Sequence, residues 1–354
     1  MSKIKVLIVD DSACSRQTIK KTLEKEPGID VVGISSDGLD AMTKTLKLKP
    51  DLITLDIEMP EMDGFTFLRW LMKKNPVPVI IVSAYSDSKT VFKALELGAA
   101  DFIAKPLKLT QAELQNMGKD LVLKLKEIRN LRMDRLSKTL ELSEEKNIQK
   151  PVHDKSSHHV EAVAIGSSTG GPAAIKVILS RLPSDFPAAI AISQHMPKGF
   201  TYSFAERLNG TSKIQVKEAE EGDELEKGKV LVSPGGYHML FQKKGRRIVA
   251  TLKEPNNIDK YIPSVDIMMT SLADVYGPKA MGVILTGMGS DGKAGMLEIR
   301  KRGGYTIVES EETAVVFGMP SEVIKAGVAG RVLPISDIPA EIIKLVGAEK
   351  QVED

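Results

Sequence analysis

Short apolar runs alternate with amphipathic segments along most of the chain, and this alternation limits the fold more than any other feature. The first hundred residues contain valine- and isoleucine-rich runs separated by segments with apolar residues at helical spacing. This pattern predicts parallel strands joined by helices. Strands are expected at residues 5–9, 31–34, 51–55, 79–83 and 101–103. We therefore predict a doubly wound α/β domain whose site lies at the carboxyl ends of its strands.

A second region with the same alternation begins near residue 161. Buried strands are expected at 161–166, 188–193, 281–285 and 305–308. Between residues 213 and 251, glycine-containing breaks predict antiparallel hairpins. We therefore predict a second doubly wound α/β domain, Rossmann-like in its architecture, with a β-hairpin insertion.

The segment between these regions differs from both. Residues 110–142 have apolar side chains every three or four positions, which predicts one long amphipathic helix. Residues 144–159 are polar and aperiodic, as in a linker. Nothing fixes the geometry of the three histidines in this stretch, so we do not expect a metal site there. The predicted divisions are 1–120 for the first domain, 121–159 for helix and linker, and 160–350 for the second domain.

Composition excludes several classes of protein. The 354 residues include 49 basic and 47 acidic side chains, so no overall positive field would draw the molecule to nucleic acid. The single cysteine, Cys14, cannot form an intrachain disulfide. No apolar run is long enough to span a bilayer, and two aspartates follow the N-terminus too closely for a signal peptide. We expect a soluble cytoplasmic protein with no nucleic-acid partner and no direct membrane insertion.

Carboxylates follow two strands of the first predicted domain. Asp10 and Asp11 end the first strand and Asp56 ends the third, while Ser83 and Lys105 lie at the ends of the fourth and fifth. Each residue alone would be an ordinary polar strand end. Together they predict a cluster that binds a hard divalent cation, most economically Mg²⁺, beside a carboxylate able to accept a phosphoryl group.

Residues 1–120 resemble a response-regulator receiver domain, a flavodoxin-like fold. The matching motifs lie at residues 7–12 (LIVDDS), 51–65 (DLITLDIEMPEMDGF), 80–84 (IIVSA) and 98–106 (GAADFIAKP). The resemblance implies that Asp56 is phosphorylated and that Ser83, Phe102 and Lys105 are the switch residues. It also implies that Mg²⁺ is held by Asp10, Asp11, Asp56 and the Glu58 carbonyl, and that the Lys105–Pro106 bond is commonly cis.

The sharpest motif of the second region is GSSTGGP at residues 166–172. A buried strand runs into small residues and then a helix, so backbone N–H groups of the helix start are exposed. Two chemistries use such a turn: phosphate binding and a nucleophilic serine with an oxyanion-stabilising site. The motif alone does not decide between them.

A serine nucleophile needs a base, and the distribution of the five histidines limits the choice. His195 ends the next predicted strand, whereas His238 follows a Pro-Gly-Gly turn and is expected on the surface. Asp291, after the strand at 281–285, is available to orient the imidazole. Taken singly, His195 could be structural and Asp291 a helix cap. Their expected positions at adjacent strand ends favour catalysis.

Residues 160–345 resemble the catalytic domain of chemotaxis-specific protein-glutamate methylesterases. The motifs are AIGSSTGGP, QHMPKGFTYSFAERLN, VSPGGYHM, PSVD, LTGMGSDGKAGM and FGMP. The resemblance implies Ser168, not Ser167, as the nucleophile, with His195 as base and Asp291 as its partner. Thr169 and Met288 match the oxyanion-stabilising region, and this site needs no cofactor.

Together the two resemblances imply a phosphorylation-activated hydrolase. Its substrates would be glutamate methyl esters of methyl-accepting chemotaxis receptors, with methanol released and receptor glutamines deamidated. A chemotaxis histidine kinase would supply the phosphoryl group, and the receiver would inhibit the esterase until Asp56 is phosphorylated.

Two other classes remain to be weighed. A phospho-switched nucleotide-binding regulator would use the turn at 166–171, but no acidic ribose-binding residue follows it in a convincing context. A transcriptional regulator would need a helix-turn-helix or a basic stripe, and the second region has neither. Nucleotide titration and a DNA shift assay, respectively, would discriminate these alternatives.

Overall fold

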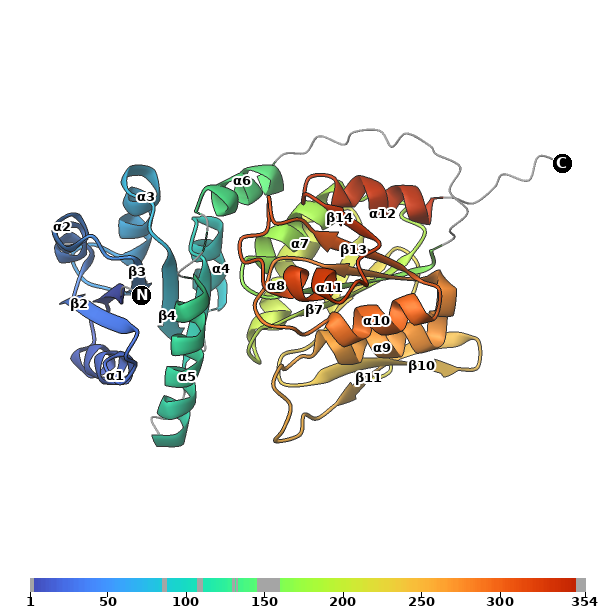
Figure 1. Cartoon of the computed structure of the whole chain (residues 1–354), viewed down its shortest axis with the longest axis horizontal. Coiled ribbons are helices and arrows are strands. Elements are labelled where there is room, and N and C mark those ends of the chain that lie inside the picture. Colours follow the sequence, from blue (N-terminus) through green and yellow to red (C-terminus); the bar gives the residue numbers. More distant parts are fainter. Residues whose placement is uncertain are drawn as a thin grey trace. The chain divides into compact units, whose positions relative to one another are not determined.

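The structure is a computed structural model that describes residues 3–84, 88–106, 111–128, 131, 133–144 and 160–347. It divides into two compact units, Met1–Ser137 and Lys138–Asp354, each built around a parallel sheet (Figure 1). The predicted linker at 145–159, including His153, His158 and His159, lies outside the described residues. Within the described ranges, no helix combines the length and apolar character that crossing a bilayer requires.

The first unit has a five-stranded parallel sheet in the order β2-β1-β3-β4-β5. Its strands are β1 (Ile4–Val9), β2 (Ile29–Ser35), β3 (Leu52–Leu55), β4 (Val79–Ala84) and β5 (Asp101–Lys105). Its helices are α1 (Ala13–Leu23), α2 (Gly38–Leu48), α3 (Gly64–Lys74), α4 (Ser88–Glu96) and α5 (Gln111–Ile128). The strand order reverses beside β1, which places a topological switch point between β1 and β3.

Burial explains why β1 has no polar face. Val6, Leu7 and Ile8 are completely buried, so both faces of the strand are covered, as expected for a parallel sheet between helices. Asp37 caps α2 by accepting the Asp40 N–H at 2.9 Å. The strand and helix pattern read from the sequence is thus supported by core burial and by caps.

The prediction of one helix over residues 110–142 is wrong. α5 ends at Ile128, and a separate helix, α6 (Met133–Glu144), follows. The Leu131 N–H donates to the Ile128 carbonyl at 2.8 Å, a three-residue bond that tightens and ends the α-helical ladder. Leu131 is buried. Its apolar side chain matches the helical spacing of the sequence, although the residue lies beyond the end of α5.

The second unit has a seven-stranded parallel sheet in the order β14-β13-β12-β6-β7-β9-β8. Its strands are β6 (Ala162–Ser167), β7 (Ala189–Gln194), β8 (Gln215–Glu218), β9 (Lys229–Val232), β12 (Ala280–Ile284), β13 (Tyr305–Glu309) and β14 (Arg331–Leu333). β6, the first of these in the chain, lies between β7 and β12. The switch point of this sheet is therefore at the carboxyl end of β6.

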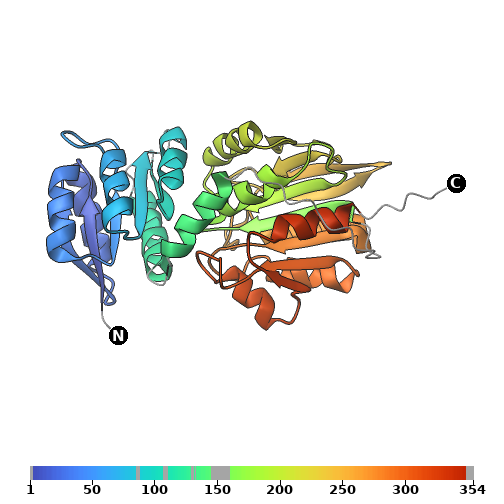
Figure 2. The same cartoon turned by 90° about the horizontal axis from the view of Figure 1, so that it is seen from above.

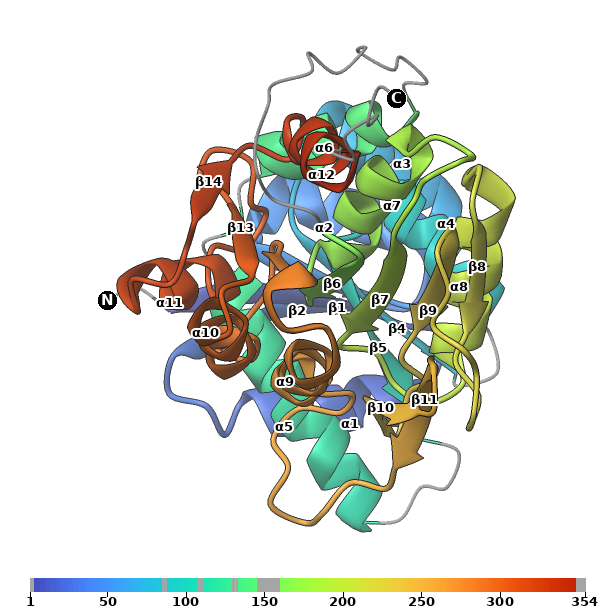
Figure 3. The same cartoon turned by 90° about the vertical axis from the view of Figure 1, so that its right-hand side faces the viewer.

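Helices cover both faces of this sheet. They are α7 (Gly171–Arg181), α8 (Phe200–Thr211), α9 (Val265–Tyr276), α10 (Lys293–Lys301), α11 (Met319–Lys325) and α12 (Ile338–Val346), with a short 3₁₀ turn at Gly277–Lys279. α7 and α12 lie on one face, and α9 lies on the other with the β10–β11 hairpin (Figure 3). Figure 2 shows α12, in dark red, lying across its face of the sheet.

The hairpin insertion is smaller than the sequence suggested. β10 (His238–Lys244) and β11 (Arg247–Lys253) form the one antiparallel pair among the described strands. β8 and β9 were expected as part of antiparallel hairpins, but they pair in parallel and extend the main sheet. The expectation failed because glycine-containing breaks do not fix the direction of the next strand: the connection at 219–228, which contains such a break, leads back to a parallel pairing.

Candidate active site

Three functional candidates follow three adjacent strands of the second sheet. Ser168 follows β6, His195 follows β7, and Asp291 lies in the loop after β12. The His195 N–H donates to the Ser167 carbonyl at 3.1 Å, and the Ser168 N–H donates to the Thr286 carbonyl at 3.1 Å. These bonds join the strand ends, so the three loops meet at the switch point of the sheet.

The two serines of the turn have different surroundings. Ser167 is completely buried, and its hydroxyl donates to Gln194 Oε1 at 2.6 Å. Gln194 Nε2 in turn donates to the Ser168 carbonyl at 2.9 Å. Ser168 is only half-buried, and its hydroxyl makes no hydrogen bond with any residue that the structure describes. Ser168 is therefore the serine available for chemistry, while Ser167 fixes the turn.

The glycines after Ser168 are required by close packing. Gly170 has a φ of +79°, in the left-handed region, and precedes α7. A Cβ on Gly171 would lie 2.1 Å from Gln194 Oε1 and 2.6 Å from Ser167 Oγ. The turn can therefore hold the serine beside the helix start only with small residues.

His195 and Asp291 are directly bonded. His195 Nε2 lies 2.8 Å from Asp291 Oδ2, and the imidazole is 14% exposed. Nε2–H must be the donor when the carboxylate is ionised, so Nδ1 carries the lone pair of the neutral ring. Nδ1 is therefore the nitrogen that can accept a proton.

Asp291 is buried, and its carboxylate accepts hydrogen bonds from backbone N–H groups. Its carboxylate accepts the N–H groups of Val265 and Asp266 at 2.7 and 2.9 Å, at the start of α9, and the Ser264 hydroxyl at 3.0 Å. Burial raises the pKa of Asp291, but the bonds to His195 and to these donors outweigh it and leave the pKa below its ordinary value. Asp291 thus stays ionised beside the imidazole.

The pKa of Asp266, a neighbouring carboxyl, is displaced in the opposite direction. Asp266 accepts the Gly295 N–H at 2.7 Å. Burial, together with the neighbouring charge of Asp291, raises the pKa of Asp266 to about 6 despite its backbone donors. The two neighbouring carboxyls therefore have pKa values displaced in opposite directions.

The loop after β12 packs directly on Ser168. A Cβ on Gly287 would lie 2.8 Å from the Ser168 nitrogen and 2.9 Å from its Cβ. The Thr286 hydroxyl donates to the Thr169 carbonyl at 3.0 Å, which ties this loop to the serine turn. The Met288 N–H has no acceptor among the residues that the structure describes. Both residues expected in the oxyanion region, Thr169 and Met288, are thus beside the serine turn.

The acidic cluster of the first unit forms at its own switch point. One carboxylate oxygen from each of Asp10, Asp11 and Asp56 lies within 4.8 Å of the others. Lys105 Nζ contacts Asp56 Oδ2 and lies 2.9 Å from Asp10 Oδ2. Three oxygen donors at this separation fit a hard divalent cation such as Mg²⁺. Glu58, whose carbonyl is the fourth expected ligand, is exposed in the loop after β3.

Burial and neighbouring charges have opposing effects on the pKa values of Asp56 and Lys105. Burial raises the pKa of Asp56, with the charge of Asp10 adding to it and Lys105 opposing it. Burial lowers the pKa of Lys105, but its bonds to Asp56 and Asp10 outweigh this effect and raise it overall. Lys105 thus takes the place of part of the cation charge that a metal would bring.

The two expected switch residues lie on neighbouring strands. Ser83 in β4 pairs with Ala104 in β5, and Phe102 lies two residues before Ala104. Both side chains are 4% exposed. The Lys105–Pro106 bond is not cis; among the described residues the cis peptide bond is Ile262–Pro263.

Comparison with known families decides the relationship. A family model described as CheB methylesterase matches residues 163–342, and a response regulator receiver domain model matches residues 6–117. The chain belongs to the CheB methylesterase family. The resemblance read from the motifs is therefore confirmed for both halves of the chain.

Individual members of this family match over nearly the whole chain. A protein-glutamate methylesterase/protein-glutamine glutaminase of Geobacter sulfurreducens is 43% identical, with all of both chains covered. One from Pyrococcus horikoshii is 42% identical over 97% of this chain and 94% of its own. The crystal structure of the Thermotoga maritima CheB methylesterase catalytic domain is 44% identical, with a TM-score of 0.52, and covers 53% of this chain and 99% of its own. The predicted α/β fold class is confirmed.

Two residues of this CheB-family unit were not expected near the site. His238, predicted to be on the surface, is completely buried. The prediction was wrong because Asp259 and Ser264, distant in sequence from the Pro-Gly-Gly turn, both bond the imidazole. Tyr261 stacks on His195 from a loop with no periodic pattern. The motif VSPGGYHM, which contains His238, and the neighbouring PSVD motif were the available signals.

A groove adjoins the Met288 loop of the CheB-family unit. It has a volume of about 430 Å³, with Gly289 and Ser290 on its lining together with Phe317 and Gly318. The Gly318 N–H donates to the Gly287 carbonyl at 3.1 Å, so the groove shares a wall with the segment that packs on Ser168.

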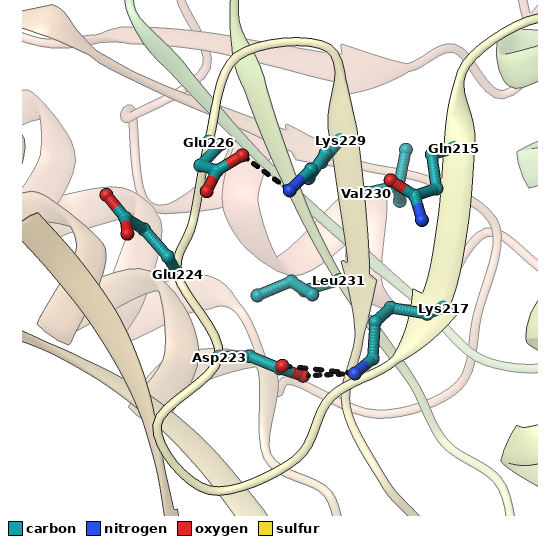
Figure 4. A pocket seen from close by; sticks show the side chains of 8 residues that line it. All are labelled: Gln215, Lys217, Asp223, Glu224, Glu226, Lys229, Val230 and Leu231. Carbon is teal, nitrogen blue, oxygen red and sulfur yellow. Dashed lines mark hydrogen bonds and ion pairs between the residues drawn. The ribbon is translucent and has the colours of Figure 1, made fainter.

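A smaller pocket at the β8–β9 edge carries no comparable chemistry (Figure 4). Its volume is about 90 Å³. Lys217 lies 2.9 Å from Asp223, and Lys229 lies 2.5 Å from Glu226. Since the lysines on its lining are paired with its acids, the pocket is a network of ion pairs and not a ligand site.

Proposed function

We propose that this chain is a phosphorylation-activated protein-glutamate methylesterase that removes methyl groups from glutamate methyl esters of chemotaxis receptors and deamidates receptor glutamines. The observation that carries this proposal is the His195–Asp291 bond at the switch point of a CheB-family unit, where the half-buried Ser168 also lies. Neither a nucleotide-binding regulator nor a transcription factor would account for that arrangement.

In the first step, Ser168 Oγ attacks the γ-carbonyl carbon of the ester. His195 Nδ1 accepts the serine proton, and Asp291 stabilises the resulting imidazolium through Nε2. The negative oxygen of the tetrahedral intermediate is stabilised by the Met288 N–H and by the N–H groups at the Thr169 turn. The imidazolium then donates its proton to the leaving methoxide, so methanol departs and an acyl-enzyme remains.

Water completes the cycle by the same route. His195 Nδ1 removes a proton from water, hydroxide adds to the acyl carbon, and the Ser168 oxygen leaves with that proton. Free glutamate is the product. A glutamine side chain follows the same steps, with ammonia leaving in place of methanol, which accounts for the glutaminase activity. The groove beside Gly289 has room for substrate residues that flank the reacting side chain.

The first unit would serve as a receiver, with Asp56 accepting the phosphoryl group from a chemotaxis histidine kinase. Asp10, Asp11, Asp56 and the Glu58 carbonyl would hold Mg²⁺, which would neutralise charge on the phosphoryl oxygens. Lys105 bonds Asp56 directly and would pair with the phosphorylated side chain. Ser83 and Phe102 would rearrange when the charge at Asp56 changes.

Regulation follows from joining the two units. The proposed divisions are a receiver at 1–120, a helix and linker at 121–159, and a catalytic domain at 160–350. The receiver would keep esterase activity low until Asp56 is phosphorylated, and the protein would act in the cytoplasm without binding nucleic acid or inserting into membrane.

Methanol release from methylated receptor tests the proposal. Wild-type protein should release methanol faster with Mg²⁺ and a small phosphoryl donor, and Ser168→Ala should abolish release because the attacking oxygen is gone. The same variant should still accept a phosphoryl group at Asp56, since the substitution leaves the receiver site intact. An undiminished rate in Ser168→Ala would reject Ser168 as the nucleophile, and no methanol release by the phosphorylated wild-type protein would reject the function.

A further inference from the structure

Tyr261 lies face to face with the proposed base. Its ring and the His195 imidazole are parallel within 6°, with ring centroids 4.9 Å apart. This spacing is within the range of stacked aromatic rings. The Asp291 bond holds one ring nitrogen but leaves the tilt of the imidazole less restricted, whereas a stacked ring restricts the tilt as well.

The phenol of Tyr261 also reaches the loop that carries Met288 and Asp291. The Ser290 N–H donates to the Tyr261 hydroxyl at 3.5 Å, at the long limit of a hydrogen bond. A Cβ on Gly289 would lie 2.2 Å from that hydroxyl, and Gly289 has a φ of +85°. One side chain therefore contacts both the base and the loop that is proposed to stabilise the oxyanion.

The Tyr261 loop is itself held by a buried histidine. His238 is completely buried, and its Nε2 lies 3.0 Å from Asp259 Oδ2. His238 Nδ1 accepts the Ser264 N–H at 3.1 Å. Both ring nitrogens are thus bonded, one on each side of Tyr261 in the chain. Because Nδ1 is an acceptor, Nε2 carries the proton and donates to Asp259.

The second of these bonds continues into the candidate active site. The Ser264 hydroxyl caps α9 by accepting the Ile267 N–H and donates to Asp291 Oδ1 at 3.0 Å. His238 therefore fixes the residue that bonds the acid and the loop whose tyrosine stacks on the base. Its own nitrogens are fully occupied, which suits a clamp and not a second proton acceptor.

We propose that Tyr261 is a positioning residue that fixes the plane of the His195 imidazole for proton transfer, and that His238 holds the loop that presents it. This inference rests on the proposed esterase function. It adds a requirement that the Ser168, His195 and Asp291 set does not contain: without the stack, the base is present and bonded to Asp291 but its Nδ1 is poorly aimed.

Steady-state methanol release by the full-length protein, with a phosphoryl donor present, gives the first test. Tyr261→Leu should lower kcat about tenfold to a hundredfold and leave KM within about twofold, because misdirected reacting groups cost rate and not ground-state binding. Tyr261→Phe keeps the ring and should restore most of the rate. Tyr202→Leu, which changes a tyrosine that is 60% exposed on α8, is the matched control and should behave like wild type.

Asp259→Ala tests whether His238 holds the Tyr261 loop. It removes the Asp259 bond to His238 and leaves the buried imidazole in place. It releases the Tyr261 side of the loop, so it should lower kcat in the same way as Tyr261→Leu. In the Tyr261→Leu background it should add less than about a twofold loss, because both changes act through the same contact. A full additional loss would overturn the role of the clamp.

A readout independent of turnover separates this inference from the proposed function. The His195 Nε2–H proton, bonded to Asp291, should give a sharp NMR signal in wild type and in Tyr202→Leu, and a broadened or absent one in Tyr261→Leu. An unchanged signal and unchanged kcat in Tyr261→Leu, or equal losses in Tyr261→Leu and Tyr261→Phe, would overturn the positioning role. No methanol release by the wild-type protein would instead overturn the proposed function, whatever the result for the Tyr261 variants.

Discussion

At the scale of single residues, the site contains two neighbouring carboxyls whose pKa values are displaced in opposite directions. Asp291 accepts two N–H groups at the start of α9, where the helix dipole also favours negative charge. Asp266 lies next to Asp291, and burial raises the pKa of Asp266 to about 6. Asp291, which bonds the imidazole directly, is thus the carboxylate that stays ionised to the lower pH.

This difference predicts a pH dependence of stability. The folded pKa of Asp266, about 6, is above its unfolded value of 3.8, so the folded state binds more protons between these values. The contribution of Asp266 therefore favours folding below about pH 4 and is lost as the pH rises to about 6. Asp266→Asn, which can still accept the Gly295 N–H, should flatten the pH dependence of the unfolding midpoint across this window. Thermal unfolding measures the midpoint at each pH. If the midpoint changes with pH equally in the variant and the wild type, the folded pKa of Asp266 is not raised.

At the scale of elements, the loop between β12 and α10 determines how tightly the serine turn is enclosed. Gly287→Ala would insert a Cβ 2.8 Å from the Ser168 nitrogen and 2.5 Å from Met319 Sδ. Since the loop must then move away from Ser168, kcat should fall about a hundredfold with a smaller change in KM. Gly210→Ala is the control, because a Cβ there meets nothing within 4 Å and the position is helical. Wild-type kcat in Gly287→Ala would mean that this packing does not align the site.

The elements also show what could be read from the sequence. Asp56, Ser168 and His195 each follow a continuous apolar run, so their positions at the ends of parallel strands followed from the pattern and from the topology of such sheets. Tyr261 and His238 could not be predicted in this way. Their contacts join β10, an irregular loop and the end of β7, and periodicity carries no information on contacts between loops. The end of α5 at Ile128 was missed because Leu125, Ile128 and Leu131 keep the helical spacing in the sequence.

At the scale of the whole molecule, the account requires that two switch points on separate sheets be linked in function. Removal of residues 1 to about 150 should raise basal methylesterase activity about tenfold, a typical size for coupling between two sites, and make it independent of phosphoryl donor. In the full-length chain, Asp56→Asn should hold activity at the unstimulated level. Methanol release by the three proteins, compared at equal concentration, checks both expectations. Equal activity of the truncated and unphosphorylated full-length proteins would refute inhibition by the receiver.

The nucleophile itself can be located by trapping the acyl-enzyme. A short peptide containing a glutamate methyl ester would be mixed with the phosphorylated full-length chain, quenched in acid within one turnover and digested for mass spectrometry. We predict the substrate peptide joined through its γ-carbonyl to Ser168 and methanol formed in equal amount. Attachment at Ser167, or methanol release with no covalent adduct at any quench time, would contradict the assignment of Ser168, His195 and Asp291 as the catalytic set.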